Sequence, residues 1–189
     1  MIERLVATRL LAYLDETGLM PSMQSAYRRN HSTKTAVLRI LSDILLAPDG
    51  GDFAALVLLD LSAAFDTVDH DTLIHRLHVS YGLRGLALDW FRSYLQGRVQ
   101  HVRFAEIAAT KSSVSTVLFD VPQGSVLGPI LYAVYRRPFS SCQQSWTSGY
   151  FYADDTQLYD ACRPAKTTDL QTRLSVCVDD VASWMSANR

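Results

Sequence analysis

Three aspartates in this sequence have the chemistry to hold a divalent metal ion. Asp60 ends an apolar run, and Asp154 and Asp155 are adjacent acids between two short strand-like segments. An unpaired carboxylate at the end of a buried strand is costly, so a cation or several hydrogen-bond donors should face Asp60. Two neighbouring carboxylates repel each other unless a cation neutralises them. The pattern is compatible with a metal site, although exposed or turn-capping aspartates would explain an Asp-Asp pair more often.

The ligand types indicate which metal such a site would bind. Carboxylate oxygens without histidine or cysteine favour Mg²⁺ or Mn²⁺. Two such ions about 4 Å apart would stabilise the attacking and leaving oxygens of a displacement at phosphorus. Other chemistries lack their motifs. Ser62, His70, His75 and His78 come with no nucleophile elbow or triad order, and the sequence has no phosphate-binding loop of the ATPase type.

Composition and charge exclude several classes of protein. The 189 residues, 48% of them hydrophobic and 20% charged, predict one globular domain. The longest apolar run, Ala54–Leu59, is far shorter than the roughly 20 residues of a membrane helix, and the charged N-terminus is not a secretory signal. The net charge of −1 does not indicate nucleic-acid binding, so any basic surface would be local, within residues 1–39 and 84–111. The three cysteines lack metal-binding or disulfide spacing, which is consistent with a nuclear or cytoplasmic protein.

The elements that must position the acids are a mixture of helices and strands. The apolar run Phe53–Leu59 predicts a strand buried on both faces, with Asp60 directly after it. Strands at 150–153 and 156–159 would form a hairpin with Asp154 and Asp155 at its tip. Further strands are predicted at 99–104 and 114–121, and helices at about 2–17, 33–47, 70–81, 84–95, from Pro129 onward, and at 168–187. These elements predict an α+β fold.

Three motifs give a more specific indication. The segment Phe151–Tyr159, with its Tyr-Ala-Asp-Asp core, resembles the catalytic hairpin of reverse transcriptases. The segment Leu58–His70 looks like the first acidic motif of that family, and Val121–Pro129 like the loop and helix between the two acidic motifs. Together with the segments Gln24–Thr33 and Leu88–Leu95, the sequences of these motifs are most similar to those of non-LTR (LINE-type) retrotransposons.

This resemblance implies an architecture and an activity. The expected fold is a palm of antiparallel β-sheet backed by helices, with a fingers remnant at about 1–50 and the palm at about 51–189. The thumb and the endonuclease of such elements would lie outside this stretch. The implied activity is that of an RNA-directed DNA polymerase that takes an RNA template, a DNA primer and dNTPs, and uses two Mg²⁺ or Mn²⁺ ions.

The resemblance also assigns roles to residues. Asp60, Asp154 and Asp155 match the metal-binding acids, and the backbone carbonyl of Leu61 matches a further ligand. Phe65 matches an aromatic ring beneath the incoming sugar, where it would collide with a ribose 2′-hydroxyl and select deoxynucleotides. For Phe65, plain core packing is the alternative.

The resemblance assigns three further residues to contacts with the substrate. Gln123 and Gly124 match the loop that contacts the incoming nucleotide and the template, where glycine allows close approach of the backbone. Arg28 matches a fingers position near the triphosphate, where a guanidinium could bind phosphate through two hydrogen bonds. A solvated loop arginine is the alternative for Arg28.

Two positions depart from the family pattern. Asp120 adds a carboxylate where a small residue is usual, which predicts negative charge near a negatively charged substrate. The stretch Arg136-Arg137-Pro138 replaces a usually acidic helix tail, and Pro138 is expected to end that helix early. Two alternatives to a polymerase fragment therefore remain: a catalytically dead remnant that only binds nucleic acid or protein, and another two-metal phosphotransferase such as a nuclease.

Overall fold

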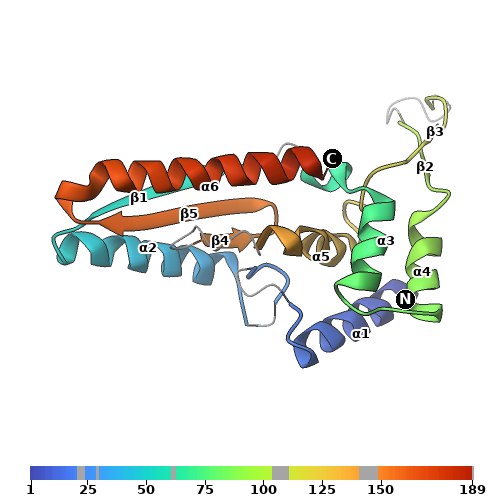
Figure 1. Ribbon diagram of the computed structural model, residues 1–189. Helices are drawn as coiled ribbons and strands as arrows, with labels where there is room; N and C mark the ends of the chain where they lie inside the picture. The colour runs from blue at the N-terminus through green and yellow to red at the C-terminus, as the bar shows by residue number, and fades with distance from the viewer. Residues whose placement is uncertain (21–23, 29, 61–62, 104–110, 141–148, 189) are drawn as a thin grey trace.

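The computed structural model describes the whole chain except residues 21–23, 29, 61–62, 104–110, 141–148 and 189 (Figure 1). The chain is mostly helical, and its small sheet is formed by segments that are distant in sequence. The elements are α1 (Ile2–Glu16), α2 (Thr33–Asp49), β1 (Phe53–Leu59), the 3-10 turn η1 (Ala64–Thr67), α3 (His70–Val79), α4 (Leu86–Leu95), β2 (Val99–Gln100), β3 (Ser115–Thr116), α5 (Gly128–Ser140), β4 (Gly149–Tyr152), β5 (Asp155–Cys162), the 3-10 turn η3 (Pro164–Lys166) and α6 (Thr167–Ala187).

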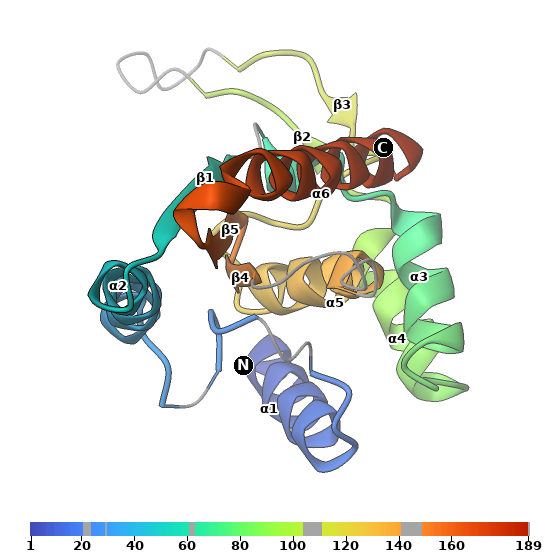
Figure 2. The ribbon, with the colours of Figure 1, turned by 60° about the vertical axis from the view of Figure 1, so that its left-hand side comes forward.

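The central sheet has three antiparallel strands in the order β1-β5-β4. β1 pairs with β5 from Phe53 opposite Cys162 to Leu59 opposite Thr156. Helix α6 covers one face of this sheet and helix α2 the other (Figures 1 and 2). The α+β prediction of an antiparallel sheet backed by helices is therefore confirmed.

The prediction that the first strand is buried on both faces is wrong. Leu56 and Leu58 of β1 are 42% and 68% exposed, while Val57 and Leu59 pack beneath α6. On the opposite face, α2 packs through Ala36, Ile40 and Ile44 against tyrosines of β4 and β5. β1 is an edge strand, so its apolar run fits a half-covered position as well as a buried one.

Local sequence signals set the helix starts more reliably than the helix ends. Ser32 caps α2, since its hydroxyl accepts a hydrogen bond from the Thr35 amide at 3.2 Å and the Thr35 hydroxyl accepts one from the Ser32 amide at 2.9 Å. The predicted strands at 99–104 and 114–121 are only two residues each among the described residues, β2 and β3. Val99, Val102 and Val114 are exposed at these positions, whereas Val117 and Val121 are buried.

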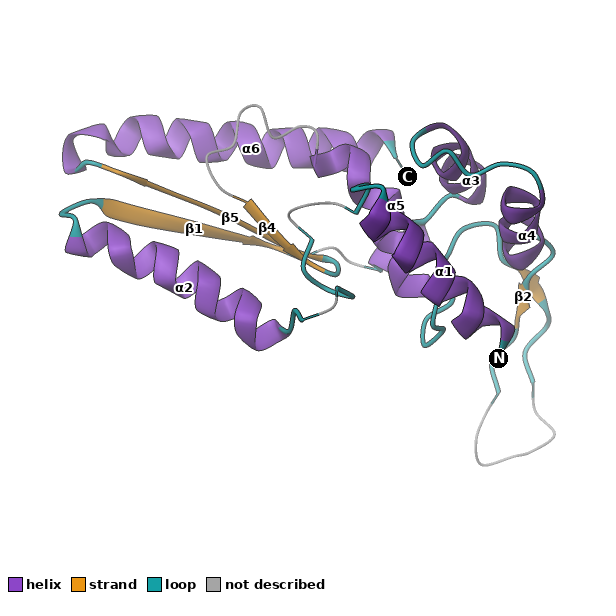
Figure 3. Cartoon of the chain, turned by 90° about the horizontal axis from the view of Figure 1, so that it is seen from below, coloured by secondary structure: helices purple, strands orange, loops and turns teal. Residues whose placement is uncertain are grey.

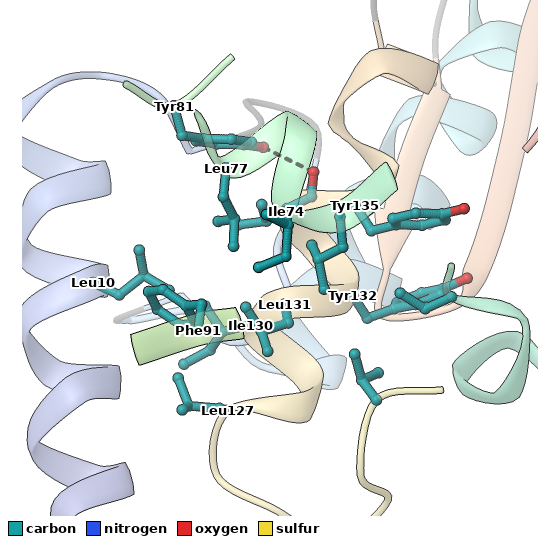
Figure 4. Packing of buried hydrophobic residues seen from close by; sticks show 14 of the residues in the cluster. Leu10, Ile74, Leu77, Tyr81, Phe91, Leu127, Ile130, Leu131, Tyr132 and Tyr135 are labelled. Atoms are coloured by element: carbon teal, nitrogen blue, oxygen red, sulfur yellow. Dashed lines mark hydrogen bonds between the residues drawn. The ribbon is translucent and has the colours of Figure 1, made fainter. Parts of the chain in front are cut away.

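The early end predicted for the helix at Pro138 is wrong as well, because α5 continues to Ser140. A proline at position 138 cannot donate a hydrogen bond to the carbonyl of Val134, four residues before it. The buried hydroxyl of Tyr81 donates to that carbonyl instead, at 3.0 Å (Figure 4). The unmade helix bond is thus replaced by a side chain from the loop after α3.

The larger hydrophobic core lies beside the sheet, among α1, α3, α4 and α5. Figure 4 shows side chains of α3 and α4 meeting those of α5, with Leu10 of α1 closing the cluster. A smaller core lies between α6 and the sheet, and Trp184 packs against both. None of the helices in the described part of the chain is long and apolar enough to cross a membrane.

Candidate active site

The two acidic segments meet at one end of the sheet. Leu59, the last residue of β1, lies opposite Thr156, so the next residues, Asp60 and Asp155, face each other across the strand ends. Asp155 also pairs with Tyr152, which leaves Ala153 and Asp154 as the two-residue turn of the hairpin. The predicted hairpin with its acids at the tip is therefore present, and Asp60 comes from the neighbouring strand.

The charges of these acids influence one another. The pKa of Asp155 is raised, first by its burial and then by the negative charges of Asp154 and Asp60, while the Arg136 guanidinium opposes that rise. Asp60 itself is exposed, so the expectation that a surrounding core requires a cation or several hydrogen-bond donors to face it is wrong. What favours a cation here is the mutual repulsion of the acids.

The donor set is chemically suited to Mg²⁺ or Mn²⁺, which take carboxylate oxygens and complete their shells with water and substrate phosphates. Among the residues that the structure describes, no group of three or more histidine, cysteine, aspartate or glutamate side chains is gathered tightly enough to enclose a metal ion. The acids therefore offer an open set of ligands at the sheet end rather than a closed protein cage. Leu61, predicted as a backbone ligand, lies outside the described residues.

Phe65 lies in η1, just after the first acid. Its ring stacks on Tyr132 of α5, with centroids 4.8 Å apart and planes 20° apart. Its carbonyl accepts a hydrogen bond from the Val121 amide at 3.0 Å, which ties η1 to the segment before the predicted nucleotide loop. Tyr132 is buried, and burial raises its pKa to about 12, so its ring is a neutral backing for Phe65.

The predicted nucleotide loop lies beside η1. The Gln123 side-chain amide donates to the Asp66 carboxylate at 3.2 Å, which brings Gln123 close to Phe65. Gly124 has a φ of +78°, a conformation that favours glycine, and a Cβ there would meet nothing within 4 Å. Glycine is therefore required by the backbone conformation and leaves open space beside the loop.

The third predicted contact, Arg28, comes from the segment between α1 and α2. Arg28 is half-buried, and its guanidinium donates to the Gln24 carbonyl at 3.4 Å. The side chain of Gln24 in turn binds the backbone of Ala153 in the hairpin turn. Arg28 is thus connected to the acidic hairpin through one intervening residue.

Asp120 does not add an isolated negative charge, contrary to the expectation from sequence. Its carboxylate forms a salt bridge with Arg98, and His70 Nε2 lies 3.6 Å from the same carboxylate oxygen. His70 Nε2 also lies 2.8 Å from the Asp120 carbonyl. A cation already compensates this carboxylate, so the departure at position 120 is accommodated within the protein.

Sequence reasoning missed three residues at the acidic end of the sheet. Arg136 is 5% exposed and donates to the carbonyls of Ala153 and Asp154, and Gln24 is 3% exposed and binds Ala153. Tyr27 lies near enough to Asp154 that, after burial, the charge of Asp154 is the largest cause of its raised pKa. For Arg136, a sequence signal was available, because it is the single arginine in the otherwise apolar helical stretch 130–136.

A cavity of about 410 Å³ opens beside the acids. It lies between the end of β1, helix α5 and the C-terminal half of α6. Asp60, Tyr132 and Arg136 line it together with Val181 and Trp184. The first acid therefore borders enclosed space with one apolar wall.

The fold is similar to that of two solved telomerase structures. The structure of apo telomerase from Candida tropicalis, truncated from its C-terminal domain, superposes with a TM-score of 0.61 at 14% identity over 92% of this chain and 36% of the telomerase chain. A second telomerase structure from that organism gives a TM-score of 0.58. The likeness identifies a reverse-transcriptase type of palm and fingers fold.

The family follows from the sequence comparisons. A family described as reverse transcriptase (RNA-dependent DNA polymerase) matches residues 1–189, and the chain belongs to this family. It is 30% identical to the RNA-directed DNA polymerase from the mobile element jockey of Drosophila melanogaster over 97% of this chain, and 36% identical to a probable RNA-directed DNA polymerase from transposon X-element of the same fly over 70%. The matches span 20% and 14% of those relatives. The predicted resemblance to a non-LTR retrotransposon reverse transcriptase is confirmed.

Proposed function

We propose that this chain is the catalytic part of an RNA-directed DNA polymerase of retrotransposon origin, with part of the fingers at about 1–50 and the palm at about 51–189. The observation that carries the proposal is the convergence of Asp60 with Asp154 and Asp155 at one end of the antiparallel sheet. Family membership makes polymerase chemistry the first use to consider for such acids. The substrates would be an RNA template, a DNA primer and dNTPs, encountered in the nucleus or the cytoplasm.

Asp60, Asp154 and Asp155 would hold the divalent ions. Two bound Mg²⁺ or Mn²⁺ ions would supply charge stabilisation at the attacking 3′-oxygen and at the leaving oxygen. The raised pKa of Asp155 supports this assignment, because carboxylates that repel each other gain most from a shared cation.

The remaining residues would orient the nucleotide. Phe65, held flat against Tyr132, would exclude the ribose 2′-hydroxyl. Gln123 could hydrogen-bond the substrate once its weak contact with Asp66 is exchanged, and the open space at Gly124 leaves room for a base or sugar. Arg28 would neutralise the triphosphate.

The test is primer extension by the purified chain on an RNA template with a DNA primer, dNTPs and either Mg²⁺ or Mn²⁺. We expect metal-dependent extension that Asp154→Asn reduces by about a hundredfold or more, because the substitution removes a ligand and a charge. Asp179→Asn, an exposed acid on α6, is the matched control and should leave extension unchanged.

Each alternative has its own result. Full extension by Asp154→Asn would overturn the assignment of the acids. Binding of the primer–template duplex without extension by the wild-type chain would favour the binding remnant, and metal-dependent cleavage of the duplex would favour a nuclease.

A further inference from the structure

The hairpin turn that presents the acids is held in an unfavourable backbone conformation. Ala153, the residue before Asp154, has a φ of +56°. This left-handed region costs a residue with a Cβ about 1 kcal/mol or more, which is why glycine or asparagine usually occupies it. Contacts from elsewhere in the protein must therefore favour this turn over its alternatives.

One set of contacts comes from Gln24, in the segment before α2. Its side-chain oxygen accepts hydrogen bonds from the amides of Ala153 at 3.0 Å and Ala26 at 3.1 Å, and its side-chain nitrogen donates to the Ala153 carbonyl at 3.1 Å. A single buried amide thus binds both polar backbone groups of the strained residue. The neighbouring Ser25 amide donates to the Phe151 carbonyl at 3.0 Å, which fixes this segment along β4.

A second set comes from Arg136, in α5 on the other side of the turn. Its guanidinium donates to the carbonyls of Ala153 and Asp154, both at 3.0 Å, and to the Thr156 hydroxyl at 2.7 Å. Its charge lies 5.2 Å from the centre of the Phe151 ring. Burying a guanidinium is costly unless hydrogen bonds compensate it, so these acceptors and this side chain depend on each other.

We propose that Gln24 and Arg136 are positioning residues that together set the place of Asp154 and Asp155 for metal binding. Both residues hold the turn through hydrogen bonds. Gln24 binds Ala153, and Arg136 binds groups from Ala153 to Thr156. Both residues hydrogen-bond the backbone that carries the acids, so we assign them an action through that backbone. This proposal rests on the proposed function of those acids.

The arrangement also connects the acids to the predicted triphosphate contact. The carbonyl of Gln24 accepts from the Arg28 guanidinium, while its side chain holds Ala153. A displacement of the segment 24–28 would therefore change the hydrogen bonds between Gln24 and the turn.

Three variants of the full chain separate positioning from general stability. Gln24→Met removes three hydrogen bonds at similar volume, Arg136→Met removes three more together with the charge, and Arg136→Lys keeps the charge but can satisfy fewer acceptors. Leu77→Ala, in the core away from the turn, supplies a loss of stability without a change in the hydrogen bonds to the turn.

Two measurements then decide the matter. The first is Mn²⁺ affinity, from the free-ion signal in electron paramagnetic resonance, corrected for the folded fraction measured by urea unfolding. The second is amide hydrogen exchange of residues 149–158 relative to that of α1. We expect both Met variants to bind Mn²⁺ about tenfold more weakly and to exchange faster in the hairpin. Arg136→Lys should be intermediate, and Leu77→Ala should match wild type per folded molecule.

Unchanged Mn²⁺ affinity and hairpin exchange in folded Gln24→Met and Arg136→Lys would overturn the proposal, even if Arg136→Met does not fold. If the wild-type chain binds no Mn²⁺, the proposed metal centre fails. The hairpin exchange still tests the hydrogen bonds to the turn in that case, so the two failures are distinguishable.

Discussion

At the scale of single residues, the pair Phe65 and Tyr132 suggests how sugar selection could be built into this site. The ring of Phe65 stacks on Tyr132, which lies in α5 and is 3% exposed. The Phe65 carbonyl is also fixed by the Val121 amide. A ring supported on its face and along its backbone cannot easily move away from a 2′-hydroxyl.

Phe65→Val should therefore relax sugar selection. Removing the ring opens space for a ribose, so we expect the ratio of ribonucleotide to deoxynucleotide incorporation to rise by about tenfold, measured by single-nucleotide primer extension. Phe53→Val, at the far end of β1, is the control with the same change of side chain. An unchanged ratio in Phe65→Val would indicate that Phe65 serves core packing alone.

At the scale of elements, the hairpin and its partners show what the sequence could and could not predict. The two strands around Asp154 and Asp155 were predictable because their pattern is local, as were α1 and α6 from their apolar periodicity. The hydrogen bonds that hold the turn were not predictable, because Gln24 and Ala153 are 129 residues apart in the sequence. The apolar run of β1 was misread since a strand covered on one face can have the same composition as a buried one.

The end of helix α5 also could not be predicted from local sequence, because the effect of Pro138 depends on a tyrosine that is distant in sequence. Tyr81→Phe should lower the free energy of unfolding by about 2 kcal/mol, since the buried Val134 carbonyl loses the hydroxyl donor that replaces its helix bond. Urea unfolding monitored by circular dichroism measures this. In a Pro138→Ala background the restored amide can bond to Val134, so the loss on Tyr81→Phe should shrink. Equal losses in the two backgrounds would refute the compensation.

At the scale of the whole molecule, the acids lie where two bodies meet. One body is the core of α1, α3, α4 and α5, and the other is the sheet with α2 and α6 (Figure 3). The acids belong to the sheet, whereas Tyr132 and Arg136 belong to α5. The geometry of the candidate site therefore depends on how firmly the two bodies are joined, as well as on the local turn.

Arg76 of α3 forms one such joint. Its guanidinium is 8% exposed and donates to the Tyr135 carbonyl of α5 and to the side chain of Asn188, just after α6. It also lies over the rings of Tyr135 and Trp184, at 4.3 Å and 5.5 Å from their centres. A single side chain thus connects α3, α5 and the end of α6.

Arg76→Met should weaken the joint between the two bodies more than it changes either one. Because the substitution leaves buried acceptors without their donor, we expect the free energy of unfolding to fall by about 3 kcal/mol in urea. Hydrogen exchange should increase at residues 180–188, at the end of α6, before it increases in α1. Arg84→Met, an exposed arginine, is the control and should change stability by less than about 0.5 kcal/mol. A fall no larger than that of the control, with exchange at 180–188 unchanged, would mean that Arg76 is not needed to join the two bodies.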